Sequence, residues 1–180
     1  MNNIITIIVG TCDNYSHLWK DFVYLFNKYW DHSIEVKKYF ITETVIDKNL
    51  DGFDFIVNGK IPYSNCLINT LDKITTPYVL WMQDDYFLRR TISKELFESY
   101  LKFIQENNVD RFGICEDSRY YTKYNIRDNF FKIDQNSKYS LSMQSSIWNT
   151  EFFKSCLIPN ENPWMFETNG TKRLNKRGHN

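Results

Sequence analysis

The residues best suited to chemistry are two adjacent aspartates, Asp84 and Asp85, at the end of an uninterrupted apolar run. Residues 78–82 have the pattern of a strand buried on both faces, as in the centre of a parallel sheet. Ligands of open α/β sheets bind at the carboxyl ends of such strands. An unpaired buried carboxylate is very costly, so the pair must be hydrated, hydrogen-bonded or bound to a cation. Mg²⁺ is usually held by one or two carboxylates plus substrate phosphates, and such a site would satisfy this pair.

A solvated turn after a strand is the alternative interpretation of the acidic pair. The chain continues as Tyr86-Phe87-Leu88 rather than as a turn rich in Gly, Pro or Asn. This context favours a ligand site over a plain turn.

A second group of polar side chains follows the first apolar run, residues 4–9, which Gly10 ends. The run is rich in β-branched residues and predicts a central strand. Thr11, Asp13 and Tyr15 then bring a hydroxyl, a carboxylate and an aromatic ring to the carboxyl end of that strand. Asp13 has two interpretations that stay open: it contacts the base or ribose of a ligand, or it is a loop or capping residue.

The remaining periodicity predicts the elements that position these groups. Strands are expected at residues 34–42 and 53–57, and helices at residues 18–29 and 63–74, where apolar residues recur at helical spacing. The first half of the chain therefore alternates strand, helix, strand, strand, helix, strand. This order favours a parallel sheet with right-handed crossovers.

The second half is expected to add a helix capped by Ser93 and further strands. The expected elements are a strand at 111–115, a long polar loop at 118–137 with a short strand at 130–133, a strand at 139–148 and a short helix at 151–156. We expect one domain over residues 1–167, followed by a flexible tail at 168–180.

Composition excludes several classes of protein. The 22 Lys and Arg balance 22 Asp and Glu, so no basic excess indicates nucleic acid or an anionic membrane. The four cysteines are widely scattered and lack zinc spacing. Three of them lie inside apolar segments, which favours small buried residues in a reducing compartment. The amino terminus lacks the features of a signal peptide, and its apolar stretch is too short to span a bilayer. We therefore expect a soluble, cytoplasmic protein with no transmembrane segment.

Four segments together resemble the small GT-A-type glycosyltransferases found in bacterial and viral polysaccharide gene sets. They are TCDNYSHLW at 11–19, LWMQDDYF at 80–87, MQSSIW at 143–148 and NPWMFE at 162–167, and they occur in the order expected for that family. The resemblance covers the chain to about Glu167. It implies a single Rossmann-like GT-A domain with a mostly parallel central sheet flanked by helices. It also implies transfer of a sugar from a nucleotide-diphosphate donor, a UDP-sugar, to a glycan or polysaccharide acceptor.

The resemblance further implies the roles of the site residues. Asp84 and Asp85 correspond to the family's Asp-x-Asp motif, with Gln83 in place of the first Asp. Asp85 is the implied ligand of Mn²⁺ or Mg²⁺, which bridges the donor diphosphate, and Asp84 contacts the ribose or supports Asp85. The loop from Thr11 to Asp13 would hold the base, and Ser64 would lie near the donor. The predicted donor-binding residues are therefore Thr11, Asp13, Tyr15, Ser64, Gln83 and Asp84.

Glycosyl transfer also needs a base that takes the proton of the acceptor hydroxyl. Glu167 is the candidate base, and Glu167 and Asp84 are the predicted catalytic residues. Glu116 and Asp117 are rival bases, because they also end a predicted strand. Whether the transfer inverts or retains the anomeric configuration stays open.

Two other classes of function stay open. A different metal-dependent nucleotidyl- or phosphoryl-transfer enzyme would use the same acid-ending strand, but the loop at 11–16 lacks the Gly-rich, basic composition that such enzymes use for phosphate. A non-catalytic sugar-binding module would instead use aromatic residues and would bind glycan without donor or metal. The candidate aromatic residues are Tyr120, Tyr121, Trp148 and Trp164; both tryptophans are also candidates to stack on an acceptor sugar, with core packing as the alternative.

Overall fold

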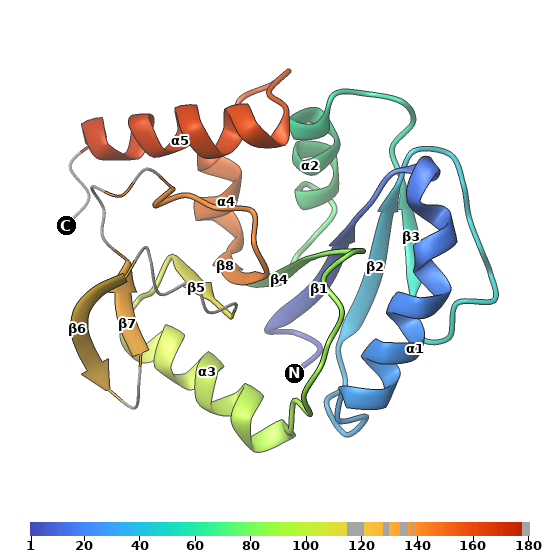
Figure 1. The fold of residues 1–180 in the computed structure, drawn as a ribbon, viewed down its shortest axis with the longest axis horizontal. Coiled ribbons are helices and arrows are strands. Elements are labelled where there is room, and N and C mark those ends of the chain that lie inside the picture. The colour runs from blue at the N-terminus through green and yellow to red at the C-terminus, as the bar shows by residue number, and fades with distance from the viewer. Residues whose placement is uncertain (115–120, 128–129, 134–136, 138, 178–180) are drawn as a thin grey trace.

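A central sheet of six strands organises the computed structural model, which describes residues 1–114, 121–127, 130–133, 137 and 139–177 (Figure 1). The strands lie in the order β3-β2-β1-β4-β8-β5. Their bounds are β1 Ile5–Gly10, β2 Lys37–Thr42, β3 Asp54–Val57, β4 Tyr78–Gln83, β5 Arg111–Gly113 and β8 Ser146–Asn149. Strands β3, β2, β1 and β4 run parallel, whereas β8 is antiparallel to both β4 and β5. The predicted α/β fold with a mostly parallel sheet is confirmed.

Helices cover both faces of this sheet. They are α1 Trp19–Tyr29, which follows the short 3₁₀ helix η1 Asp13–Leu18, α2 Tyr63–Leu71, α3 Lys94–Glu106, α4 Thr150–Cys156 and α5 Pro163–Arg177. One apolar cluster contains Phe22 of α1, Phe97 of α3 and Ile7 of β1. A second cluster contains Phe166 of α5 and Ile8 of β1, together with side chains of α2 and α4. Because consecutive residues of β1 enter different clusters, this strand is buried on both faces, as its apolar run predicts.

The connections place a topological switch point between β1 and β4. From β1 the chain moves outward to β2 and β3, and it then returns through α2 to β4 on the other side of β1. Parallel strands whose connections leave in opposite directions form a crevice at their carboxyl ends, where ligands of open α/β sheets bind. The acidic pair lies at this edge, immediately after β4.

Two strand predictions in the second half are wrong in extent. Strand β8 covers Ser146–Asn149 only, because its ladder to β4 begins at the pair Trp81 and Ser146, and residues 139–145 form a non-strand segment. Residues Tyr121–Arg127, expected as part of a polar loop, form strand β6, which pairs with β7, Phe130–Ile133. The sequence of this segment is polar and Tyr-rich with little apolar periodicity, so its pattern did not predict the strand Tyr121–Arg127.

The prediction of a flexible tail is wrong for residues 168–177, which continue helix α5. Thr171 is buried, and its hydroxyl accepts a hydrogen bond of 3.1 Å from the Leu141 amide. Gly170 packs so closely that a Cβ atom there would lie 2.4 Å from a methyl carbon of Leu141. The Arg173 guanidinium forms a two-pronged ion pair of 2.7 and 2.9 Å with Glu161, whose side chain is buried. Polar and small residues therefore anchor this part of α5, and an apolar periodicity could not reveal them.

Other predictions can be checked in the described part of the chain. The Ser93 hydroxyl accepts a hydrogen bond from the Leu96 amide and so caps α3, as predicted. The cysteines at 12, 66 and 156 are not disulfide-bonded, and Cys115 lies outside the described residues. Over the same residues, no helix combines the length and apolar character needed to cross a membrane.

Candidate active site

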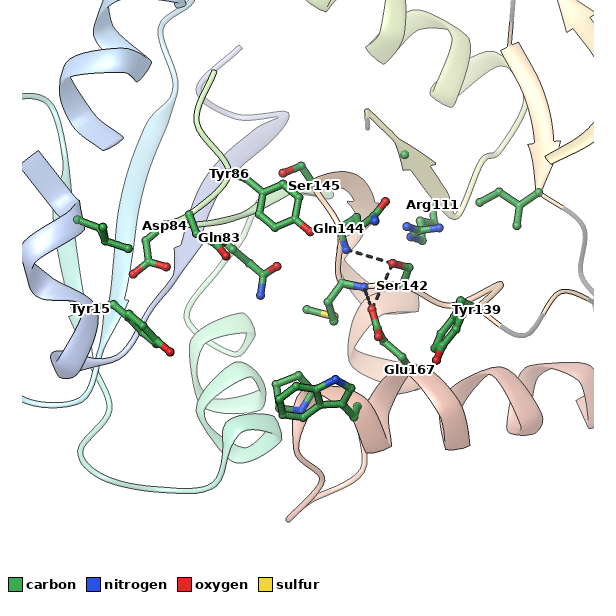
Figure 2. A pocket seen from close by; sticks show the side chains of 17 residues that line it. Tyr15, Gln83, Asp84, Tyr86, Arg111, Tyr139, Ser142, Gln144, Ser145 and Glu167 are labelled. Carbon is green, nitrogen blue, oxygen red and sulfur yellow. Dashed lines mark hydrogen bonds between the residues drawn. The ribbon is translucent and has the colours of Figure 1, made fainter. Parts of the chain in front are cut away.

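A cleft of about 590 Å³ opens at the switch point, between the ends of β1 and β4 and the start of α5. Five predicted site residues line it: Tyr15, Gln83, Asp84, Asp85 and Glu167. Figure 2 shows Asp84 and Gln83 on one side of the cleft and Glu167 on the other. The structure therefore brings the acidic pair that follows β4 and Glu167 of α5 into one cleft.

The acidic pair forms a turn in which the two carboxylates differ in their exposure to solvent. The Tyr86 amide donates a 3.0 Å hydrogen bond to the Gln83 carbonyl, and the Asp84 amide donates one of 3.3 Å to the Gly10 carbonyl. Asp84 is 6% exposed, whereas Asp85 is exposed. The turn interpretation of the sequence is thus correct for the backbone, and the same turn directs both residues to the cleft.

A hydrogen-bonded relay holds the Asp84 carboxylate in place. The Thr11 hydroxyl donates to Asp84 and accepts a 2.8 Å hydrogen bond from the indole nitrogen of Trp19, which is buried in the core. Burial raises the pKa of the Asp84 carboxyl above its ordinary value; the Thr11 hydrogen bond opposes this shift and the charge of Asp85 reinforces it. Thr11 therefore supports Asp84 and does not itself line the cleft.

The acidic pair fits one kind of cation site. Among the described residues, no group of three or more His, Cys, Asp or Glu side chains could enclose a metal ion. A closed zinc site is therefore not formed by these residues. The exposed Asp85, with Asp84 beside it, matches the one or two carboxylates that hold Mg²⁺ when substrate phosphates supply the remaining ligands.

Asp13 has a structural role in the loops above the sheet. Its carboxylate accepts hydrogen bonds from the amides of Thr44 and Val45, at 3.1–3.2 Å, and from the Thr44 hydroxyl at 2.5 Å. Desolvation alone would raise the pKa of Asp13, but these hydrogen bonds outweigh it and lower the pKa. Asp13 does not line the cleft. Of its two predicted interpretations, the structure favours the loop residue, which ties the end of β2 to the end of β1.

Ser64 is placed away from the cleft. It is fully buried in α2, and its hydroxyl accepts a 2.9 Å hydrogen bond from the Glu161 amide, while its own amide donates one of 3.2 Å to the Glu161 carbonyl. Ser64 therefore fixes the loop before α5 against α2. The structure does not bring it to the cleft with the other predicted donor-binding residues.

Glu167 is held by the segment that precedes β8. Its Oε1 atom accepts hydrogen bonds from the Met143 amide at 2.7 Å and from the Ser142 hydroxyl at 3.2 Å (Figure 2). The Met143 carbonyl in turn accepts a 2.8 Å hydrogen bond from the buried indole of Trp81 in β4. The core strand thus positions Glu167 through Met143. The rival bases Glu116 and Asp117 lie outside the described residues.

The sequence analysis missed several cleft residues. Tyr86, Arg111, Tyr139, Ser142, Gln144 and Ser145 also line it. The antiparallel ladder of β8 on β4 brings the segment at 142–145 alongside the end of β4, and this pairing has no signature in the sequence. The Arg111 guanidinium lies 5.2 Å from the centre of the Trp148 ring. The Ser145 hydroxyl is buried and has no hydrogen-bond partner among the residues that the structure describes, so a ligand could satisfy it.

The two candidate stacking tryptophans have different environments. Trp148 is fully buried and stacks on Phe153 with ring centres 4.4 Å apart, so it belongs to the core. Trp164 is 73% exposed and lines the cleft. Tyr120 lies outside the described residues, and Tyr121 is placed in β6.

Comparisons with known proteins bear on the fold. No protein-family model matches the sequence, and no curated protein matches it. Among solved structures, S. aureus TarS residues 1–349 in complex with UDP gives a TM-score of 0.62 at 16% identity, over 95% of this chain and 54% of that one. The same fragment in complex with UDP-GlcNAc gives 0.57 at 16% identity, over 93% and 54%. The bifunctional IspDF from Campylobacter jejuni gives 0.50 at 15% identity, over 97% and 47%.

These similarities concern architecture. The chain spans about half the length of these three structures, with 47–54% of each covered, and 33% of a longer TarS chain. Similarity at 15–16% identity supports a shared fold only, so the activity must be inferred from the site itself. This chain shares with TarS a Rossmann-like α/β fold with a mostly parallel sheet, as its sequence predicts.

Proposed function

We propose that the chain is a glycosyltransferase that moves a sugar from a nucleotide-diphosphate donor to a glycan acceptor. The observation that carries this proposal is the arrangement of one cleft: an acidic pair at the switch point of the sheet and a fixed glutamate on the opposite wall. A cation and diphosphate suit the first side, and proton abstraction suits the second. Direct displacement uses both sides of the cleft: the leaving diphosphate is stabilised on one and the acceptor proton is removed on the other.

The donor lies over the carboxyl ends of β1 and β4 in this proposal. Asp85 would hold Mn²⁺ or Mg²⁺ together with the donor diphosphate, and Tyr15, which is 53% exposed at the cleft, would contact the nucleotide. The bound cation would stabilise the negative charge of the leaving diphosphate. Solved complexes of the similar TarS fold with UDP and UDP-GlcNAc support a UDP-sugar as the donor.

Glu167 acts as the base in this proposal. Its Oε1 atom is held by Met143 and Ser142, and Oε2 accepts no hydrogen bond from the described residues. Oε2 takes the proton of an acceptor hydroxyl while that oxygen bonds to the anomeric carbon of the donor. The bond between this carbon and the diphosphate oxygen breaks, and its electron pair leaves with the diphosphate. Direct displacement of this kind inverts the anomeric configuration.

A product test distinguishes this reaction from nucleotidyl transfer. The protein is incubated with Mn²⁺ and either a UDP-sugar such as UDP-GlcNAc with a methyl glycoside as acceptor, or a nucleoside triphosphate with a sugar phosphate, and the products are separated by ion-exchange chromatography. Release of UDP supports glycosyl transfer. Release of pyrophosphate from a nucleoside triphosphate, with no UDP from any UDP-sugar, would contradict it.

A further inference from the structure

One tryptophan is exposed in a chain that otherwise buries this residue type. Trp19, Trp30, Trp81 and Trp148 are each at most 4% exposed, whereas Trp164 is 73% exposed. Its indole lines the cleft that contains Asp84 and Glu167. Covering an indole removes a large apolar area from water, so a ligand that packs on Trp164 gains affinity from that contact.

The backbone that carries this indole is fixed. The Asn162 side chain accepts a 2.9 Å hydrogen bond from the Met165 amide and caps the first turn of α5. The Thr168 hydroxyl donates a 2.7 Å hydrogen bond to the Trp164 carbonyl. Phe166, two positions further, is fully buried and packs on Phe153 with ring centres 6.1 Å apart. The exposed indole therefore extends from an anchored helix, and only its side-chain torsions remain to be ordered when it binds a ligand.

Trp164 and Glu167 lie on the same face of α5. Residues three apart on a helix are surface neighbours, and both of these side chains line the cleft. A molecule that packs on the indole therefore lies one helical turn from the carboxylate proposed as the base. This position suits the acceptor rather than the diphosphate, because Figure 2 shows Asp84 across the cleft from Glu167.

The cleft also offers polar groups to a ligand on this platform. The buried Ser145 hydroxyl has no partner within the described part of the chain, and the side chains of Gln144 and Ser142 line the same cleft. An exposed aromatic face beside hydrogen-bonding groups suits a sugar ring, which has an apolar face of C–H groups and a rim of hydroxyls. A purely apolar partner would leave the Ser145 hydroxyl unsatisfied.

We propose that Trp164 is the platform on which a pyranose ring of the acceptor stacks, with the acceptor hydroxyl directed to Glu167. This inference rests on the proposed function for the identity of the ligand as acceptor. The stacking itself is a property of Trp164 and can be measured without donor.

The fluorescence of the single exposed indole can show whether a ligand covers it. Acrylamide quenches exposed tryptophan far more than buried tryptophan, so the accessible fluorescence of the full chain should belong to Trp164, and Trp164→Phe should abolish it. We expect methyl β-D-glucopyranoside, methyl β-D-galactopyranoside or the corresponding N-acetylglucosaminide to protect this fluorescence. Sorbitol, which has hydroxyls but no ring face, should not protect it. Equal quenching with and without saturating glycoside, or equal protection by sorbitol, would overturn the proposal.

Variants on the same helix separate stacking from general effects. Saturation-transfer NMR with the same glycosides should show affinity reduced about tenfold or more in Trp164→Ala, a loss of about 1.4 kcal/mol, and largely retained in Trp164→Phe. Met165→Ala is the matched control, because Met165 is 42% exposed on α5 and does not line the cleft. Unchanged glycoside affinity in Trp164→Ala would overturn the proposal. Loss of Trp164 quenching on raising the protein concentration alone would also overturn it, because a second copy would then cover the indole.

Titration with UDP distinguishes failure of the proposed transferase function from failure of the proposed Trp164 platform. Glycoside protection without any UDP binding would retain the sugar platform and contradict the transferase. UDP binding without glycoside protection would retain the donor site and overturn the platform.

Discussion

Asp84 and Asp85 are neighbours in sequence with opposite relations to solvent. Asp84 is buried and tied to Thr11, and Asp85 is exposed. The Asp85 carboxylate lines the cleft, so a cation can approach it there without breaking a hydrogen bond to any described residue. The two residues therefore have different roles in this account. Asp84 is held within the turn, and Asp85 is the proposed ligand of the cation.

The raised pKa of Asp84 predicts how stability changes with pH. Because the folded chain binds a proton at Asp84 more tightly than the unfolded chain does, this stabilisation is fully present below the ordinary Asp value of 3.8. It is lost as the pH rises through the raised pKa. We expect Asp84→Asn to reduce the decline in the free energy of unfolding between acidic and neutral pH, measured by urea unfolding in EDTA.

Asp21→Asn is the control for that pH series, because Asp21 is an exposed carboxylate on α1. Its profile should follow that of the wild type. An Asp84→Asn profile that also follows the wild type would contradict the burial argument.

Glu167→Gln should separate chemistry from binding. Glutamine keeps an oxygen that can accept from the Met143 amide but cannot accept the acceptor proton at neutral pH. We expect kcat for transfer to fall about 100-fold or more, with UDP affinity changed by less than about threefold. Glu98→Gln, on the exposed face of α3, should leave kcat unchanged. A wild-type kcat in Glu167→Gln would show that another residue acts as the base.

Some residue roles could be predicted from the sequence and others could not. The apolar run before Asp84 and the aromatic context of Glu167 are local patterns, and both residues line the cleft. Asp13 and Ser64 also looked suited to a ligand, but their hydrogen-bond partners are 31 and 97 positions away in the chain. A polar side chain that is satisfied by a distant backbone amide cannot be distinguished from a binding residue by its neighbours in sequence.

The contact between β1 and β4 links the core to both walls of the cleft. A Cβ atom on Gly10 would lie 2.1 Å from a ring carbon of Trp81, so only glycine fits beneath this indole. The Trp81 indole also holds the Met143 carbonyl, and the Met143 amide holds Glu167. Packing between two adjacent strands therefore sets the position of the glutamate.

Gly10→Ala should destabilise the protein through this contact. The added methyl group must displace the buried Trp81 ring, which we expect to cost about 1–3 kcal/mol in urea unfolding. Trp81→Phe provides a smaller ring, and the double variant should lose less stability than the sum of the two single variants. Strict additivity would show that the clash is relieved elsewhere.

Elements with apolar periodicity were predictable, and elements held by polar or small residues were not. Strand β4 and helix α3 follow their apolar patterns, and α3 has its predicted cap. The second half of α5 depends on Gly170, Thr171 and Arg173, which contact Leu141 and Glu161. Such contacts depend on tertiary structure, so the local sequence suggested a flexible tail.

The topology of the whole sheet creates the cleft. Alternating strands and helices predict parallel strands, but not that β8 enters between β4 and β5 in the antiparallel direction. This insertion carries the segment at 142–145 to the end of β4, where it meets both Gln83 and Glu167 in one cleft. The site therefore depends on strand order, which apolar periodicity along the chain does not reveal.

The structure also predicts that the folded unit extends past Glu167. A chain truncated to residues 1–167 loses Thr171 and leaves the buried Glu161 without Arg173. We expect it to lose about 3–5 kcal/mol of stability in urea unfolding. Arg173→Met should reproduce much of this loss, whereas Lys172→Met, at an exposed position of α5, should not. A truncated chain as stable as the full chain would restore a domain boundary at Glu167.

The most direct test of the proposed donor site is calorimetric titration of UDP into the folded protein, with Mn²⁺ and then with EDTA. We expect binding that requires Mn²⁺ and that weakens about tenfold or more in Asp85→Asn, equivalent to about 1.4 kcal/mol, but not in Asp21→Asn. Absence of UDP binding by the folded wild type, or binding that is indifferent to both EDTA and the Asp85 substitution, would contradict a metal-assisted nucleotide-sugar site at the end of β4.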